Sequence, residues 1–204
     1  RLAFLNYTYG TNGIPVPENN VVSLIENERM LRDLKAASDS VVDKVIVFIH
    51  WGDEYQRQPN AFQKETASFL FNHGADIIIG SHPHVLQPME WHTADSVNKE
   101  RLVVWSLGNF VSNQRKQYTD GGAMVSVTLQ KTAGKSSIKQ AGYKLSWVFN
   151  PVISGRRQYY ILPAASYEND TILLDAGSRS SLNQFLVDSR KLLGDFNVNM
   201  GEIK

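Results

Sequence analysis

Two histidines that flank a proline follow an apolar run near the middle of the chain. The run covers residues 77–79, a glycine and a serine end it, and His82 and His84 come next. Consecutive β-branched residues are typical of a strand buried on both faces. In extended backbone, side chains two positions apart point to one side, and Pro83 disfavours helical backbone at His82. Because imidazole nitrogens bind transition metals, the pair is predicted to form a two-nitrogen metal-binding group.

A third histidine, His50, has the same setting, at the end of an apolar run over residues 44–49. Residues 60–73, between the two runs, carry apolar side chains at helical spacing. A right-handed strand–helix–strand crossover would make the two strands parallel and place His50, His82 and His84 at one edge of the sheet. Sites in open α/β sheets form at that edge.

Each histidine also has a purely structural explanation. His50 alone would be read as a hydrogen-bonded core residue, and only the group of three at strand ends favours a metal site. His73 precedes a glycine at the end of the predicted helix and is read as a capping residue, whereas His92 lies in a polar connection and is expected to be exposed. Asp53 and Glu54 are either a solvated loop or groups that face the metal or the substrate.

The remaining pattern completes a mixed architecture. We predict a first strand at 2–5, a glycine- and proline-rich loop at 7–17, an amphipathic helix at 18–40 and a strand at 102–107. Alternating strands follow at 121–129 and 139–149 with a turn at 134–136, then a strand at 159–163 and a closing helix at 178–193. This order predicts an α/β fold in which two sheets form a sandwich with helices outside.

Composition excludes several classes of function. The 204 residues contain 21 Lys and Arg against 20 Asp and Glu, so no strong overall charge favours nucleic acid. No apolar run approaches the roughly 18 residues of a membrane span. The absence of cysteine leaves nitrogen and oxygen as the only metal ligands. The chain opens at Arg1 directly into a strand-like segment, and we expect an upstream portion to precede it.

Several spaced motifs occur in the first half of the chain. They are HWGDEY at 50–55 followed by Pro59 and Gln63, GAD at 74–76, GSHPHVLQ at 80–87 and SLGNF at 106–110. Together, from residue 2 to about residue 109, they resemble the CapA family of bacterial poly-γ-glutamate capsule biosynthesis proteins. That family is similar to the calcineurin-like metallophosphoesterases.

The resemblance implies a fold and a metal centre. The fold is the four-layer metallophosphoesterase arrangement with its amino-terminal part absent, so residues 1–204 would be the carboxyl-terminal portion of one domain, with a motif-bearing core at about 1–130. His50, His82 and His84 would be ligands of two divalent ions, Mn²⁺, Fe²⁺ or Zn²⁺. The family's carboxylate-bearing ligand motifs would lie upstream, so this chain alone is expected to bind metal weakly and to turn nothing over.

Two functions from different classes remain open. In the first, the chain belongs to a metal-dependent phosphoesterase or related hydrolase, with Glu54 and Asn109 as catalytic groups and Trp51, Asp53 and Tyr55 as substrate contacts. In the second, it is a non-catalytic accessory protein that binds an anionic surface polymer.

Partners and location are implied by the resemblance alone. The substrate would be a phosphoester or an anionic polymer, and the protein would act with a membrane-associated polymer-synthesis complex. It would lie in the bacterial cell envelope, outside the cytoplasm, anchored by an upstream segment. The isolated chain is expected to self-associate through an unpaired strand edge.

Overall fold

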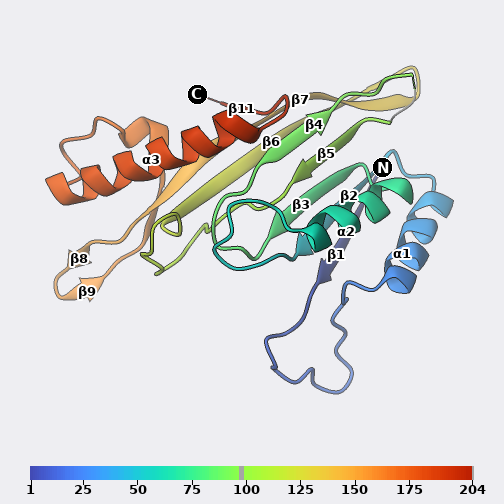
Figure 1. The fold of residues 1–204 in the computed structure, drawn as a ribbon, viewed down its shortest axis with the longest axis horizontal. Helices are drawn as coiled ribbons and strands as arrows, with labels where there is room; N and C mark the ends of the chain where they lie inside the picture. Colours follow the sequence, from blue (N-terminus) through green and yellow to red (C-terminus); the bar gives the residue numbers. More distant parts are fainter. Residues whose placement is uncertain (97–98, 204) are drawn as a thin grey trace.

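Two β-sheets with helices on their outer faces make up the structure, a computed structural model that describes residues 1–96 and 99–203. Helices α1 and α2 lie against the first sheet, and α3 lies along the second (Figure 1). The predicted α/β two-sheet sandwich flanked by helices is thereby confirmed.

The first sheet is mainly parallel. Its strand order is β1-β2-β3-β5-β4, with β1 at Leu2–Thr8, β2 at Lys44–His50, β3 at Ile77–Ser81, β5 at Arg101–Val104 and β4 at Met89–His92. Only β4 runs antiparallel to its neighbour. At the carboxyl edge, Thr8 pairs with His50 and His50 pairs with Ser81, so the ends of three strands are aligned.

Helices α1 (Asn27–Asp39) and α2 (Ala61–Asn72) cover the outer face of this sheet. A capping box starts α2: the Asn60 side chain accepts a hydrogen bond from the Gln63 amide at 2.8 Å, and the Gln63 side chain accepts one from the Asn60 amide at 3.1 Å. The shared core contains buried residues of both helices and of the strands, among them Met30, Leu34, Val45, Val47, Ile49, Leu70 and Ile78.

The second sheet is built on a long hairpin, β6 (Gly121–Thr132) and β7 (Lys135–Phe149). Ala133 and Gly134 join the strands with φ angles of 48° and 82°, as a two-residue hairpin turn requires. The predicted turn at 134–136 is therefore displaced by one residue. Strands β10 (Tyr160–Pro163) and β11 (Gly201–Glu202) pair with β7, and β8 (Val152–Ile153) and β9 (Arg156–Arg157) form a separate small hairpin.

Helix α3 (Ala176–Phe196) closes the second sheet after a 3-10 turn at Ala164–Tyr167. Asp175 caps it by accepting a hydrogen bond from the Ser178 amide at 2.7 Å. The predicted apolar stripe is buried, and it packs in one cluster with inward side chains of both sheets. These include Leu182, Phe185, Leu186 and Leu193 of the helix, Ile77, Leu102 and Val104 of the first sheet, and Leu145 and Trp147 of the second.

Ion pairs of the buried Lys44 join the amino ends of the strands. Lys44 is buried, and its ammonium group lies 3.0 Å from the Asp76 carboxylate and 3.3 Å from that of Glu100. Glu100 also accepts a hydrogen bond from the Ile138 amide of β7 at 2.8 Å. Both sheets are thus joined at the edge opposite the histidines.

Three sequence predictions need correction. The predicted helix at 18–40 begins only at Asn27, because residues 23–25 pair with the end of β1 through a bridge between Thr8 and Leu24. Strand β5 ends at Val104, and Leu107 makes only an isolated bridge to Leu86. His92 lies in a strand that was not predicted, β4, and its Nε2 is 2.9 Å from a Glu90 carboxylate oxygen.

His73 is the C-cap residue of α2, as predicted, and its ring Nδ1 lies 2.8 Å from the Phe69 carbonyl oxygen.

Within residues 1–96 and 99–203, none of the helices is both long and apolar enough to cross a membrane.

Replacing Ile78 by Ala tests the central strand. Ile78 is fully buried between the helices and the sheet, so the change is expected to lower the free energy of unfolding by about 2–5 kcal/mol through lost burial and a cavity. Val187→Ala, at an exposed position on α3, is the control and should change it by less than about 0.5 kcal/mol. Urea unfolding of both variants measures this; equal effects would contradict the central placement of β3.

Candidate functional site

Three histidine rings meet at the carboxyl edge of the first sheet. His50 ends β2, and His82 and His84 lie in the turn after β3. The ring centroids of His50 and His82 are 4.6 Å apart, and those of His82 and His84 are 6.1 Å apart. His50 Nε2 lies 3.0 Å from His82 Nδ1, so one nitrogen donates a hydrogen bond to the other. The parallel strand–helix–strand unit thus brings the predicted ligands together.

The backbone that carries His82 and His84 is not extended, which corrects the sequence prediction. Strand β3 ends at Ser81, and the φ angles of His82 and His84 are 108° and 60°. Such left-handed backbone costs about 1–3 kcal/mol per residue and is concentrated at functional sites. The turn is held by the Tyr55 amide, which donates to the Pro83 carbonyl at 2.8 Å. Tyr55 itself has a φ of 65°.

Asn109 fixes the orientation of His84. Its Oδ1 lies 3.0 Å from His84 Nδ1, while its side-chain nitrogen donates to the Thr119 carbonyl at 2.8 Å and to Gln114 Oε1 at 3.1 Å. Because the amide nitrogen is committed to these oxygens, Oδ1 must accept, and His84 Nδ1 carries the proton. The lone pair of His84 is then on Nε2, which lies 3.9 Å from a Glu54 carboxylate oxygen.

The surroundings of His50 and His82 favour the neutral form of their imidazole rings. Burial lowers the pKa of His50 below its ordinary value, and the nearby His82 and His84 lower it further. Burial also lowers the pKa of His82, against the opposing effect of the Glu54 carboxylate. Neutral rings keep a free lone pair near pH 7, which a metal ligand or a general base needs.

Aromatic rings surround the histidines. The Tyr9 ring lies 5.7 Å from that of His50 and 4.5 Å from that of His82, and the Tyr55 ring stacks on His84 at 5.9 Å. The Lys116 ammonium group lies 4.6 Å from the centre of the Tyr55 ring. This places a cation beside the cluster, where it can attract an anionic ligand.

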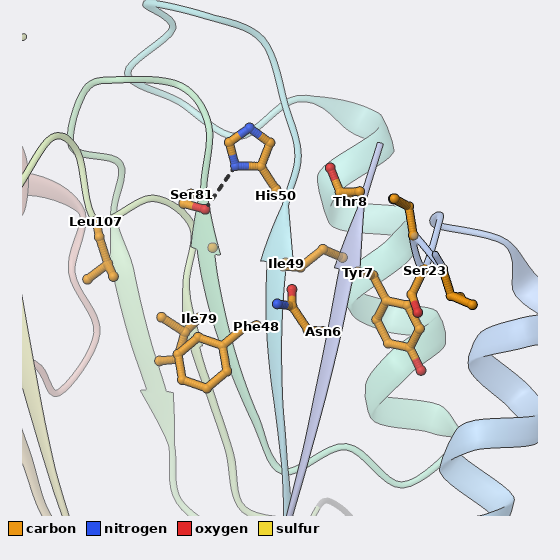
Figure 2. A pocket seen from close by; sticks show the side chains of 13 residues that line it. Asn6, Tyr7, Thr8, Ser23, Phe48, Ile49, His50, Ile79, Ser81 and Leu107 are labelled. Atoms are coloured by element: carbon orange, nitrogen blue, oxygen red, sulfur yellow. Dashed lines mark hydrogen bonds between the residues drawn. The ribbon is translucent and has the colours of Figure 1, made fainter. Parts of the chain in front are cut away.

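A cavity of about 680 Å³ opens beside His50 on the inner face of the sheet (Figure 2). Polar groups of Thr8 and Ser81 line it at the sheet edge, and Asn6, Phe48 and Ile79 line it one step farther in. Figure 2 shows His50 hydrogen-bonded to Ser81; the distance from His50 Nδ1 to Ser81 Oγ is 3.2 Å.

Two residues predicted to contact the substrate have other roles. Trp51 is buried in the helix-side core, where its ring nitrogen donates to the Trp105 carbonyl at 3.0 Å. Since successive strand residues point to opposite faces, His50 on the inner face forces Trp51 outward. Asp53 is exposed and accepts a hydrogen bond from the Asn60 side chain at 2.7 Å, which supports the start of α2.

Sequence reasoning missed three neighbours of the histidines. The sequence predictions give no role to Ser81 and Lys116, and they place Tyr9 only in the loop at 7–17. The position of Ser81 in a parallel strand beside His50 was the available signal, because the ends of such strands lie together. Lys116 carried no sequence signal.

A divalent metal fits this site only in part. Three imidazoles with two adjacent nitrogens suit first-row transition metals. Yet within residues 1–96 and 99–203, no three His, Asp or Glu side chains are arranged to hold an ion. Among the described residues the site therefore offers imidazole nitrogens, with the Glu54 carboxylate nearby, but no complete set of metal ligands.

Comparison with known proteins identifies the family. The model of the family described as bacterial capsule synthesis protein PGA_cap matches residues 1–114, more than half of the chain. The chain belongs to this family. The matched range contains all three clustered histidines as well as Asn109.

Two curated relatives agree with this assignment. The chain is 43% identical to the PGA biosynthesis protein CapA of Bacillus subtilis over 89 residues, which cover 44% of the chain and 22% of that protein. It is 33% identical to the capsule biosynthesis protein CapA of Bacillus anthracis over 135 residues, 64% of the chain and 31% of that protein. The chain thus spans less than a third of the length of these relatives.

The depressed pKa of His50 predicts a pH dependence of stability. Between about pH 7.5 and 5.5 the unfolded imidazole takes up a proton near its ordinary pKa of about 6.5, while native His50 resists it. The unfolded state then binds more protons, so the free energy of unfolding should fall as the pH falls. Urea titrations should show a smaller fall in His50→Gln than in the unsubstituted chain; equal slopes would rule out a depressed native pKa.

Proposed function

We propose that this member of the capsule synthesis family contributes the histidine ligands of a metal-dependent hydrolase that acts on an anionic substrate. The observation that carries the proposal is the convergence of His50, His82 and His84, two of them with lowered pKa, at the carboxyl edge of a parallel sheet. Packing alone does not require three imidazoles at one point, and strained backbone at two of them adds to the case.

His50, His82 and His84 would hold divalent metal, Mn²⁺, Fe²⁺ or Zn²⁺, together with carboxylates from outside residues 1–204. When bound, two such ions polarise a phosphoryl or acyl oxygen and lower the pKa of a bound water. His50 and His82 need no prior loss of a proton near neutral pH, because burial lowers the pKa of both rings and favours their neutral form.

The remaining residues of the site would orient the histidines, transfer protons or bind the substrate. Asn109 holds His84 with its Nε2 lone pair free. Glu54, half-exposed beside that nitrogen, is placed to accept a proton from the attacking water or to pass one to the leaving group. Lys116, at the Tyr55 ring, supplies positive charge for a phosphate or carboxylate of the substrate.

The second candidate is binding without catalysis. It is favoured by the lack, among the described residues, of any group of three acidic or histidine side chains that could hold an ion. The names of both relatives also refer to biosynthesis and to no hydrolysis. In this case an anionic polymer such as poly-γ-glutamate would lie against the histidine cluster on the side of His84, with Lys116 and Tyr55 as contacts.

The family supports a proposal for location and partners. A capsule lies outside the cell, so the protein would act in the cell envelope, together with a membrane-associated polymer-synthesis complex and anchored by a segment outside residues 1–204. The formal charge of +1 gives no reason to expect nucleic acid as a partner.

Metal titration of the full natural polypeptide tests the ligand assignment. Calorimetry with Mn²⁺ or Zn²⁺ should show binding that His82→Ala weakens by at least about tenfold, since even partners of ligands contribute that much. His92→Ala is the matched control and should leave the affinity unchanged, because β4 places His92 beside Arg101 at the opposite end of β5. Equal affinities for all three proteins would contradict the assignment.

Turnover separates the two candidate functions. With Mn²⁺, the full polypeptide should hydrolyse a chromogenic phosphodiester, and Glu54→Gln should lower kcat by about 10²- to 10⁴-fold, as expected for the loss of a general acid or base. Lys116→Gln should mainly raise KM, whereas Lys191→Gln, an exposed lysine of α3, should change neither constant. No turnover, combined with poly-γ-glutamate binding that survives chelation, would establish the binding function instead.

A further inference from the structure

Strands β8 and β9 form a small hairpin that projects from the body of the molecule (Figure 1). Ser154 and Gly155 make its two-residue turn, with φ angles of 50° and 76°. Every residue from Val152 to Tyr160 is exposed. An isolated two-stranded hairpin is marginally stable in water, because it has no core of its own. The hairpin is therefore a segment that would gain stability from contact with a partner.

Each face of this hairpin combines an aliphatic side chain with an arginine. Val152 is paired with Arg157, and Ile153 is paired with Arg156. Residues directly opposite each other on antiparallel strands share a face, so neither face is wholly apolar or wholly polar. Val152 and Ile153 are 62% and 48% exposed. Aliphatic side chains exposed beside arginines suit a boundary between an apolar and an aqueous region.

The hairpin lies in a basic part of the chain. From residue 121 to residue 167 the sequence contains no Asp or Glu, although the formal charge of the whole chain is only +1. The basic residues of this range are Lys131, Lys135, Lys139, Lys144, Arg156 and Arg157. Lys131 forms an ion pair with Asp43, whereas neither arginine of the hairpin has a carboxylate partner within the described residues. Charge complementarity therefore requires a negatively charged partner.

We propose that the β8–β9 hairpin docks on a membrane surface that contains anionic lipid. Val152 and Ile153 enter the boundary between the headgroups and the acyl chains, and Arg156 and Arg157 bind lipid phosphates. At the base of the hairpin, Tyr159 is 41% exposed. The amphipathic ring of tyrosine favours the headgroup level, so the base of the hairpin suits the same surface.

A lipid surface fits the hairpin better than a protein or a polymer does. A standard protein interface takes about 20–30 residues from each side, and residues 152–157 are far fewer. A hydrated polyanion would pair with the arginines and leave Val152 and Ile153 in water. A lipid surface satisfies both kinds of side chain at once. The inference rests on the hairpin and is independent of the hydrolase proposal.

A fluorescent label at the turn tests the inference. Residues 1–204 contain no cysteine, so Ser154→Cys gives a single labelling site once any cysteine elsewhere in the full natural polypeptide is replaced. The thiol carries a nitrobenzoxadiazole probe, which brightens when it leaves water. Val187→Cys on α3, 63% exposed, is the matched control. Each labelled polypeptide is combined with vesicles of phosphatidylcholine alone or with added phosphatidylglycerol, with and without nitroxide-labelled lipid as a quencher.

The Ser154→Cys label should brighten with phosphatidylglycerol vesicles and should be quenched by the nitroxide lipid, whereas the Val187→Cys label should change little. Combining Arg156→Gln with Arg157→Gln should lower the ratio of docked to undocked hairpin at least about tenfold, because each basic residue near an anionic surface adds to binding. Lys191→Gln, at an exposed lysine of α3, should leave this ratio unchanged.

Three results would overturn the proposal. The first is a Ser154→Cys label that brightens no more with phosphatidylglycerol than with phosphatidylcholine alone. The second is equal brightening of the Val187→Cys label, since the contact would then not be specific to the hairpin. The third is brightening by soluble poly-γ-glutamate without vesicles, because the hairpin would then bind the polymer.

Discussion

The parallel pairing of β1, β2 and β3 is the constraint on which the site depends. It aligns Thr8, His50 and Ser81 across the carboxyl edge and, through alternation along each strand, decides which side chains face inward. A slip of β2 by one residue would turn Trp51 toward the cavity and bury His50 under the helices. The helix-side core opposes that slip, because Val45, Val47, Ile49 and Trp51 are all buried in it.

Gln63 couples this sheet edge to the loops around the histidines. Its side chain completes the capping box of α2 and donates to Gln87 at 2.8 Å, and Gln87 in turn donates to the Gln56 carbonyl at 2.9 Å. The buried amide network leaves no room at Gly52, where an added Cβ would lie 2.6 Å from Gln63 Oε1. One helix cap thereby fixes the turns after β2 and β3, and a fully bonded buried network of this kind is costly to rearrange.

Sequence patterns were sufficient to predict the strands and helices whose apolar residues form runs or recur at regular spacing. Apolar runs and helical spacing predicted β2, α2 and β3, and the crossover rule then brought His50 to His82 and His84. Where single residues decide the geometry, the patterns failed. The left-handed backbone at His82 and His84 depends on tertiary contacts, and β4 is too short to show a period. Trp51 follows His50 in the sequence, which suggested a place at the site. Successive residues at the end of a strand point to opposite faces, however, and Trp51 is buried on the helix side.

An apolar groove of about 650 Å³ between β6 and the inner face of the first sheet shares one boundary with the cavity beside His50. Phe48, Ile79, Ser81 and Leu107 line both the groove and the cavity beside His50. A molecule that covers this face would therefore also wall the cavity beside His50. Excluding water there strengthens every charge interaction. Burial at this boundary lowers the pKa values of His50 and His82, so both rings tend to stay neutral and keep a free lone pair beside the cavity.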